Sequence, residues 1–196
     1  REMTVDLTIT PQDVSISNVR QILFAGGKWV GNYISPELEV PEAHKAVLMQ
    51  VGAYARDHGH VAKEGINCGI DYFVSGDEVI VTEINARWTG GLFPAEFLRR
   101  LAITQPAVAF FDMVPEAQSE AVRTFQREHL FPAAGDSFAY VPMGFTPFAM
   151  EIEGAERYFV WQIVVGDFAS FVEAKRQALT EDAFPTAELI LQEALS

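Results

Sequence analysis

The stretch Gly69 to Gly91, "GIDYFVSGDEVIVTEINARWTGG", constrains the fold of this chain more than any other. Two runs rich in branched and aromatic residues flank the short segment SGD, a pattern typical of a β-hairpin. Folding the chain about Asp77 places Asp71 opposite Glu83. Because side chains alternate between the faces of a strand, one face is expected to hold Asp71, Phe73, Val79, Val81, Glu83 and Asn85. The other face, expected against the core, would hold Ile70, Tyr72, Val74, Ile80, Thr82 and Ile84.

Two acids opposite each other on a hairpin require a physical explanation. Directly opposed side chains lie ~5 Å apart at Cβ, where like charges destabilise the pair. We therefore expect a compensating cation between Asp71 and Glu83, and Mg²⁺ fits because it takes carboxylate, phosphate and water oxygens. Asn85 adds an amide oxygen two residues further along the same face. A register slip of one residue would break this pairing.

The residues after the hairpin favour a ligand that carries phosphate or carboxylate groups. Arg87 continues the face of the acids, and its guanidinium could stabilise charge that develops in phosphoryl transfer. Gly90 and Gly91 let the backbone come close to a ligand, and a helix that opens near Pro94 favours an anion at its N-terminus. Trp88 lies between these features. The alternatives are a surface ion pair for Arg87, a simple turn at the glycines and rim packing for the tryptophan.

The pattern resembles a known family. An acid followed twelve positions later by Glu-x-Asn-x-Arg, here Asp71, Glu83, Asn85 and Arg87, is similar to the metal-binding signature of the ATP-grasp ligases. The preceding "HKAVLMQVGAYARDHGHVAKEGINCGIDY" is similar to the helix that leads into this signature. The resemblance covers residues 4 to 101 and corresponds to the later half of the family's nucleotide-binding region.

The resemblance implies a site and a reaction. Asp71, Glu83 and Asn85 would bind Mg²⁺, for which Mn²⁺ can substitute, together with the phosphates of ATP. Arg87 would be catalytic and hold an acyl-phosphate or carboxylate, Lys28 would reach phosphates or substrate, and Trp88, Gly90 and Gly91 would line the substrate site. The implied reaction joins a small-molecule carboxylate to an amine or similar nucleophile through an acyl-phosphate, without a protein nucleophile.

The resemblance also implies an organisation. The expected fold is α+β, an ATP-grasp-type antiparallel sheet with flanking helices, plus a smaller C-terminal α/β portion. Residues 1–132 are expected to form the C-terminal half of an ATP-grasp domain and residues 133–196 an appended portion. The half that contacts adenine is expected to belong to an upstream segment of the same protein. A non-catalytic ATP-grasp-like binding or assembly module is the alternative, and a metal-dependent hydrolase ranks last because no His or Lys base adjoins the acids.

Other elements follow from periodicity and from glycine and proline. Strands are expected at 4–10, 14–24, 136–144, 148–154 and 157–166, and a Gly- and Pro-rich loop at 25–41. Helices are expected at 42–58, 94–103, 115–130, 168–179 and 185–195.

Charge and cysteine content narrow the class of protein. With 14 Lys and Arg against 27 Asp and Glu, the net charge of −13 opposes binding to nucleic acid or to an anionic membrane surface. Cys68 is the only cysteine, so no internal disulfide can form, and we expect a cytoplasmic protein. The four histidines show no zinc-ligand spacing. The sequence leaves open whether the chain forms a homo-oligomer.

Overall fold

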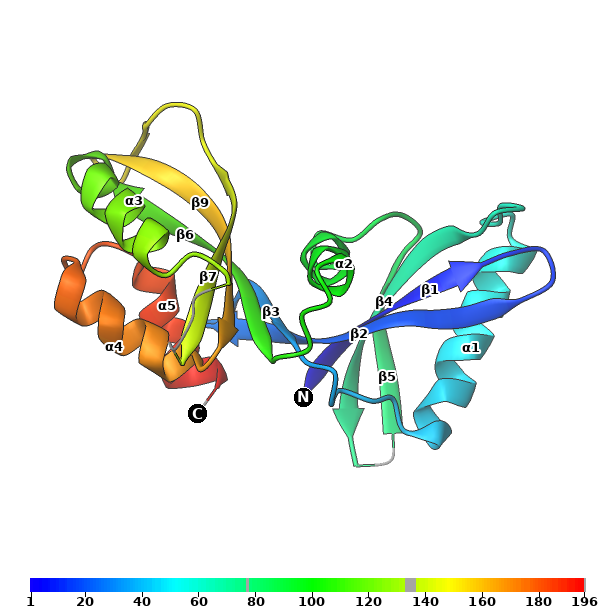
Figure 1. The fold of residues 1–196 in the computed structure, drawn as a ribbon. Coiled ribbons are helices and arrows are strands. Elements are labelled where there is room, and N and C mark those ends of the chain that lie inside the picture. Colours follow the sequence, from blue (N-terminus) through cyan, green and yellow to red (C-terminus); the bar gives the residue numbers. More distant parts are fainter. Residues whose placement is uncertain (77, 133–136, 196) are drawn as a thin grey trace. The chain divides into compact units, whose positions relative to one another are not determined.

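The computed structural model describes residues 1–76, 78–132 and 137–195. The chain forms two compact units (Figure 1). The first consists of Arg1–Ile22 and Ile34–Thr104, and the second of Leu23–Tyr33 and Gln105–Ser196. Each unit has its own buried hydrophobic cluster, so each is described by itself.

The first unit is an antiparallel sheet with two helices. Its strands are β1 (Glu2–Ile9), β2 (Val14–Ala25, of which the residues up to Ile22 belong here), β4 (Ile66–Ser75) and β5 (Glu78–Asn85). Their order is β5-β4-β1-β2, and each neighbouring pair is antiparallel. The helices are α1 (Glu42–Asp57) and α2 (Leu92–Arg100).

Strand alternation gives this sheet an apolar face and a polar face. Val5, Leu7 and Ile9 of β1 are fully buried in one cluster with Leu48 of α1. Helix α1 comes close to the sheet at Gly52, where a Cβ atom would lie 2.6 Å from both Leu7 Cδ1 and Val14 Cγ1. The intervening residues of β1, Thr4 and Asp6, are also buried, and they share the other face.

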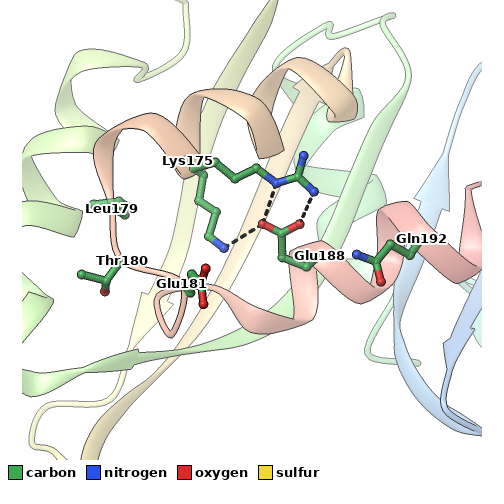
Figure 2. Close-up of a pocket in the computed structure, with 7 residues that line it drawn as sticks. Lys175, Leu179, Thr180, Glu181, Glu188 and Gln192 are labelled. Atoms are coloured by element: carbon green, nitrogen blue, oxygen red, sulfur yellow. Dashed lines mark hydrogen bonds and ion pairs between the residues drawn. The ribbon is translucent and has the colours of Figure 1, made fainter.

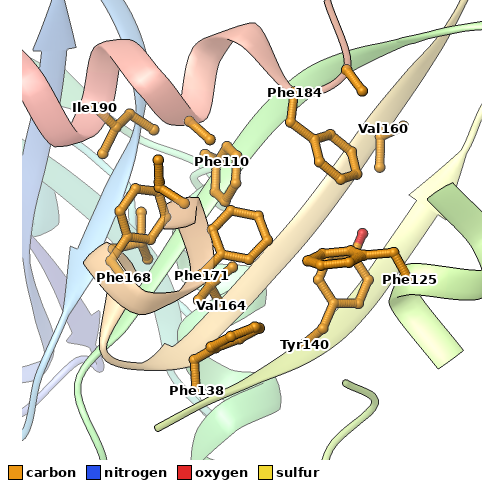
Figure 3. Packing of buried hydrophobic residues seen from close by; sticks show 14 of the residues in the cluster. Phe110, Phe125, Phe138, Tyr140, Val160, Val164, Phe168, Phe171, Phe184 and Ile190 are labelled. Atoms are coloured by element: carbon orange, nitrogen blue, oxygen red, sulfur yellow. The ribbon is translucent and has the colours of Figure 1, made fainter. Parts of the chain in front are cut away.

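The second unit also combines strands and helices. It contains the last residues of β2, then β3 (Lys28–Ile34), β6 (Ala107–Pro115), β9 (Ala155–Gly166) and β7 (Phe138–Phe145) in that order, and β8 (Met150–Ile152) pairs with β9. Its helical segments are η1 (Glu116–Gln118), α3 (Ser119–Glu128), α4 (Phe168–Ala178), α5 (Pro185–Leu189) and the π-helical η2 (Ile190–Ala194). Aromatic side chains from the strands and helical segments of this unit fill one core (Figure 3), including Phe110, Phe125, Phe138, Phe168, Phe171 and Phe184.

Several elements differ from the sequence expectations. The segment 25–41, expected to be a loop, contains strand β3, because Gly31 lets this strand lie against β6. A Cβ atom at Gly31 would lie 2.4 Å from the carbonyl oxygen of Ala109, so the glycine marks close packing instead of a turn. Strand β6 was not anticipated. The helix expected at 115–130 is a 3-10 turn followed by the shorter α3, and α2 begins at Leu92 instead of Pro94.

The expected α+β class with an antiparallel sheet and flanking helices is confirmed. The expected division between residues 132 and 133 falls at the edge of the undescribed residues 133–136, as does the expected start of a strand at residue 136. That division remains a prediction. Among the described residues, no helix has both the length and the apolar composition needed to cross a membrane.

Candidate functional site

The hairpin pairs the two acids as predicted. Asp71 lies opposite Glu83, and Gly69 lies opposite Asn85. One residue further, however, Tyr72 pairs with Val81, so β5 carries an extra residue at Thr82. The Thr82 hydroxyl donates a hydrogen bond to the Asp71 carbonyl at 3.0 Å. Asp77, about which the hairpin was expected to fold, lies outside the described residues.

This bulge corrects the predicted faces of the hairpin. Val79 and Val81 were expected beside the acids, but they pair with Val74 and Tyr72 and pack against the core. Ile80 was expected in the core, but it is 53% exposed. One inserted residue shifts the alternation of side chains in the strand that carries it. The side chains of β5 between the bulge and the turn therefore lie on the opposite face from the one expected.

The acids belong to two cross-strand rows on the polar face. In the first row, here called the acid row, Arg20 of β2 is followed by Thr4 of β1, Asp71 of β4 and Glu83 of β5. The second, here called the amide row, lies two residues further along every strand and consists of Asn18, Asp6, Gly69 and Asn85. A four-strand register thus gathers polar groups from three separate stretches of sequence on one face.

The surroundings of Asp71 in the acid row make its charged form less favourable. Asp71 is half-buried and Glu83 is exposed. Burial raises the pKa of Asp71, the neighbouring Thr4 hydroxyl lowers it, the Glu83 carboxylate raises it, and the more distant Arg20 lowers it. The net result is a raised pKa, which is expected when a carboxylate is desolvated beside another acid. A cation between these two carboxylates would reverse that penalty.

The donor set fits Mg²⁺. Asn85 is buried, and its Nδ2 donates to Asp71 Oδ2 at 3.3 Å, so the amide adjoins the Asp71 carboxylate. Among the described residues, no group of three or more His, Cys, Asp and Glu side chains is placed to hold a metal ion. Two carboxylates and an amide make a partial shell, and Mg²⁺ commonly completes such a shell with water and phosphate oxygens.

The residues after the hairpin lie in a turn that leads into α2. The Arg87 backbone N–H donates to the Asn85 carbonyl at 2.7 Å, and its exposed guanidinium donates to the Trp88 carbonyl at 3.3 Å. Trp88 is 64% exposed. A Cβ atom at Gly90 would meet nothing within 4 Å, and Gly91 is the N-cap residue of α2. Gly90 is therefore not required by close packing, and contact of these residues with substrate remains a prediction.

Lys28 belongs to a different compact unit from the acid row. It is an exposed residue at the start of β3, in the second unit. Its proposed reach to phosphates or substrate remains a prediction.

The sequence analysis did not anticipate a buried polar cluster beside the acids. Arg20 Nη1 forms an ion pair with Asp6 Oδ2, and both residues are fully buried. Arg20 Nη1 also donates to Asn18 Oδ1 at 2.8 Å. Arg20 Nη2 donates to Thr89 Oγ1 at 3.1 Å, and that hydroxyl donates to Asp6 Oδ1 at 3.0 Å. The alternating polar residues of β1 and β2 were the available signal, but the register of β1 on β4 was not readable.

The second unit has a pocket of its own (Figure 2), with a volume of about 470 Å³. Three of its charged groups are paired with one another, because Glu188 accepts from Lys175 at 3.0 Å and from Arg176 at 2.6 Å. None of the residues predicted to form a site lines this pocket.

Comparison with known proteins supports the fold. No protein-family model matches the chain, and no curated protein matches it in sequence. Solved structures do match. The phosphoribosylaminoimidazole carboxylase ATPase subunit from Aquifex aeolicus has a TM-score of 0.51 at 10% identity, covering 90% of this chain and 54% of that one. The ADP complex of PurK, an N5-carboxyaminoimidazole ribonucleotide synthetase, has a TM-score of 0.52 at 11% identity, covering 89% and 48%.

A further match is a protein from Archaeoglobus fulgidus assigned to the ATP-grasp superfamily, with a TM-score of 0.45 at 18% identity, covering 85% and 46%. The chain shares the fold of the Aquifex aeolicus subunit and of PurK over most of its length, and this similarity supports, at the level of the fold, the resemblance to the ATP-grasp family seen in its sequence. It spans about half the length of these structures.

Proposed function

We propose that this chain provides the metal and phosphate side of the active site of an ATP-dependent ligase. The observation that carries the proposal is the acid row, in which Asp71 lies opposite Glu83 while the Asn85 amide contacts Asp71. Opposed carboxylates on a half-buried face are costly without a cation. The ATP-grasp fold supports nucleotide use, and the matched PurK structure is an ADP complex.

The proposed roles follow from position and charge. Asp71, Glu83 and Asn85 would hold Mg²⁺, which would neutralise the phosphates of ATP. Arg87 follows Asn85 by two residues, and its exposed guanidinium can take a second carboxylate or phosphate oxygen. Trp88, Gly90 and Gly91 would lie along the substrate. Lys28, from the second unit, is proposed as a further phosphate or substrate contact.

The proposed reaction is the ligation of a carboxylate to an amine or a similar nucleophile. ATP phosphorylates the carboxylate, and the nucleophile then attacks the acyl-phosphate carbon and displaces phosphate. The side chains of the acid row would bind and orient, and none of them becomes covalently linked to the substrate. An upstream segment of the same protein is proposed to supply the remaining ATP contacts, because the chain spans about half the length of the matched structures.

The test is a Mn²⁺ titration followed by electron paramagnetic resonance, with and without ADP. Wild type is compared with the double variant Asp71→Asn, Glu83→Gln, which keeps the shape of both side chains but removes their charge. We expect saturable Mn²⁺ binding in wild type that tightens with ADP and is lost in the variant.

A matched control uses another pair of acids in the second unit. Glu156 raises the pKa of Glu116 by hydrogen bonding and charge, so these two carboxylates also lie close together. The double variant Glu116→Gln, Glu156→Gln removes the same charge and should bind Mn²⁺ and ADP as wild type does. Equal loss in both double variants, or no saturable binding in wild type, would contradict the proposed site and favour a non-catalytic module.

A further inference from the structure

The hydroxyl of Thr89 makes two hydrogen bonds to buried side chains of the protein. It donates to Asp6 Oδ1 at 3.0 Å and accepts from Arg20 Nη2 at 3.1 Å. A hydroxyl has one proton to donate, and that proton is directed to Asp6. Thr89 therefore differs from its exposed neighbours Arg87 and Trp88, although all three follow the hairpin within a few residues.

The two side chains that bind the Thr89 hydroxyl are charged. Asp6 and Arg20 are fully buried on adjacent strands and form an ion pair. A buried ion pair is tolerated when further hydrogen bonds satisfy its remaining donors and acceptors. Asn18 provides one such bond at 2.8 Å and the Thr89 hydroxyl provides two more, whereas Arg20 Nε has no hydrogen-bond partner among the described residues.

Gly69 makes room for this contact. A Cβ atom at Gly69 would lie 2.2 Å from Thr89 Cγ2, far inside van der Waals contact. Gly69 stands in the amide row between Asp6 and Asn85. Thr89 thus lies over β4 at the position next to the amide that contacts Asp71.

Fixing Thr89 fixes the segment that carries the candidate ligands. One end of this segment is Asn85, which pairs with Gly69, and the Arg87 N–H donates to the Asn85 carbonyl at 2.7 Å. At the other end, the Thr89 carbonyl accepts from the Leu92 N–H at 3.2 Å, where α2 begins. The contact of Thr89 with Asp6 and Arg20 ties the middle of the segment to β1 and β2.

We propose that Asp6, Arg20 and Thr89, here called the Thr89 anchor, are positioning residues of the candidate site. The anchor holds the turn after β5 so that Asn85 stays in contact with Asp71 and the backbone at Arg87 keeps its place. This inference rests on the function proposed above.

The test compares Thr89→Val with Thr89→Ser. Valine keeps the shape of threonine but leaves Asp6 and Arg20 with buried unsatisfied groups, whereas serine keeps the hydroxyl. We expect Thr89→Val to weaken Mn²⁺-ADP binding about tenfold, as is typical when the support of a metal ligand is removed. Thr89→Ser should bind within about twofold of wild type, since it retains both hydrogen bonds of the anchor.

A second measurement does not depend on the metal. Hydrogen exchange of the Arg87 and Leu92 amides reports whether the turn is held, and we expect it to be about tenfold faster in Thr89→Val than in Thr89→Ser. A purely structural role would lower the melting temperature and leave both Mn²⁺-ADP affinity and exchange in this turn unchanged, and this result would overturn the inference. If wild type binds no Mn²⁺-ADP, the proposed function fails. The comparison of Arg87 and Leu92 amide exchange between Thr89→Val and Thr89→Ser still decides whether the Thr89 hydroxyl holds the turn.

Discussion

At the scale of single residues, Gly69 has a packing role that its position in a strand does not indicate. It lies in the middle of β4, where a glycine normally weakens a strand. Its φ is not in the left-handed region, so the backbone would accept any residue. The reason for glycine is the side chain above it, because Thr89 Cγ2 occupies the place of a Cβ atom.

This steric reading predicts a rescue. Gly69→Ala should destabilise the first unit by about 2 kcal/mol through overpacking against Thr89. Because serine lacks Cγ2, Thr89→Ser in the same chain should recover most of that loss, although Thr89→Ser alone should be slightly destabilising. A double-mutant cycle by urea unfolding measures this coupling. Additive effects of the two substitutions would show that the close contact is not the reason for glycine.

At the scale of elements, the hairpin was largely predictable and its neighbours were not. The pairing of Asp71 with Glu83 depends on two adjacent strands and a short turn, so local sequence specifies it. The bulge at Thr82 has no such local signal, and it moved Val79, Val81 and Ile80 to the opposite faces. The family signature selects the candidate metal ligands without reference to faces, so this error did not change the set of candidate residues.

The Thr89 anchor shows the limit of sequence reasoning more clearly. Thr89 and Asp6 are 83 positions apart, and their contact depends on the registers of β1 with β2 and with β4. Nothing in the local sequence of β1, β2 or β4 specifies these registers. Strand β3 was missed for a related reason, since Gly31 allows close packing against β6 but, in the sequence, indicates a loop.

In the second unit, one carboxylate links β6 to the C-terminal helices and gives a prediction about pH. Asp112 is buried, and its oxygens accept from the backbone N–H groups of Met113 at 2.8 Å and of Thr186 and Ala187 at 3.0 Å. Burial raises the pKa of Asp112 to about 7, despite the opposing effect of these hydrogen bonds. Between pH 3.8 and about 7, Asp112 therefore keeps its proton in the folded state but releases it in the unfolded state.

The sign of the resulting pH dependence follows by linkage. The stability from this proton is fully present below the ordinary aspartate pKa of 3.8 and is lost as the pH rises through about 7. The Asp112→Asn variant lacks this titrating group. The unfolding free energy of wild type should therefore fall relative to that of the variant between pH 4 and pH 7. A change on the order of 2–4 kcal/mol is expected. Parallel stability curves for the two proteins over this range would contradict the assignment.

At the scale of the whole molecule, a net charge of −13 attracts cations diffusely, and a specific site must be distinguished from this background. Diffuse attraction is screened by any salt and acts on both units, whereas the acid row lies in the first unit alone. A ligand that binds only the folded state stabilises it by about 2.7 kcal/mol at a concentration 100-fold above its dissociation constant.

Mg²⁺ with ADP should therefore stabilise the two units unequally. At matched ionic strength, we expect hydrogen exchange to slow in β4 and β5, which carry Asp71 and Glu83, and to change little in β6 and β9. The slowing should vanish in Asp71→Asn, Glu83→Gln and persist in Glu116→Gln, Glu156→Gln, because the latter removes equal charge from the other unit. Uniform slowing in both units, or slowing that survives loss of the acid row, would mean that the molecule's overall charge and not this pair of carboxylates attracts the ion.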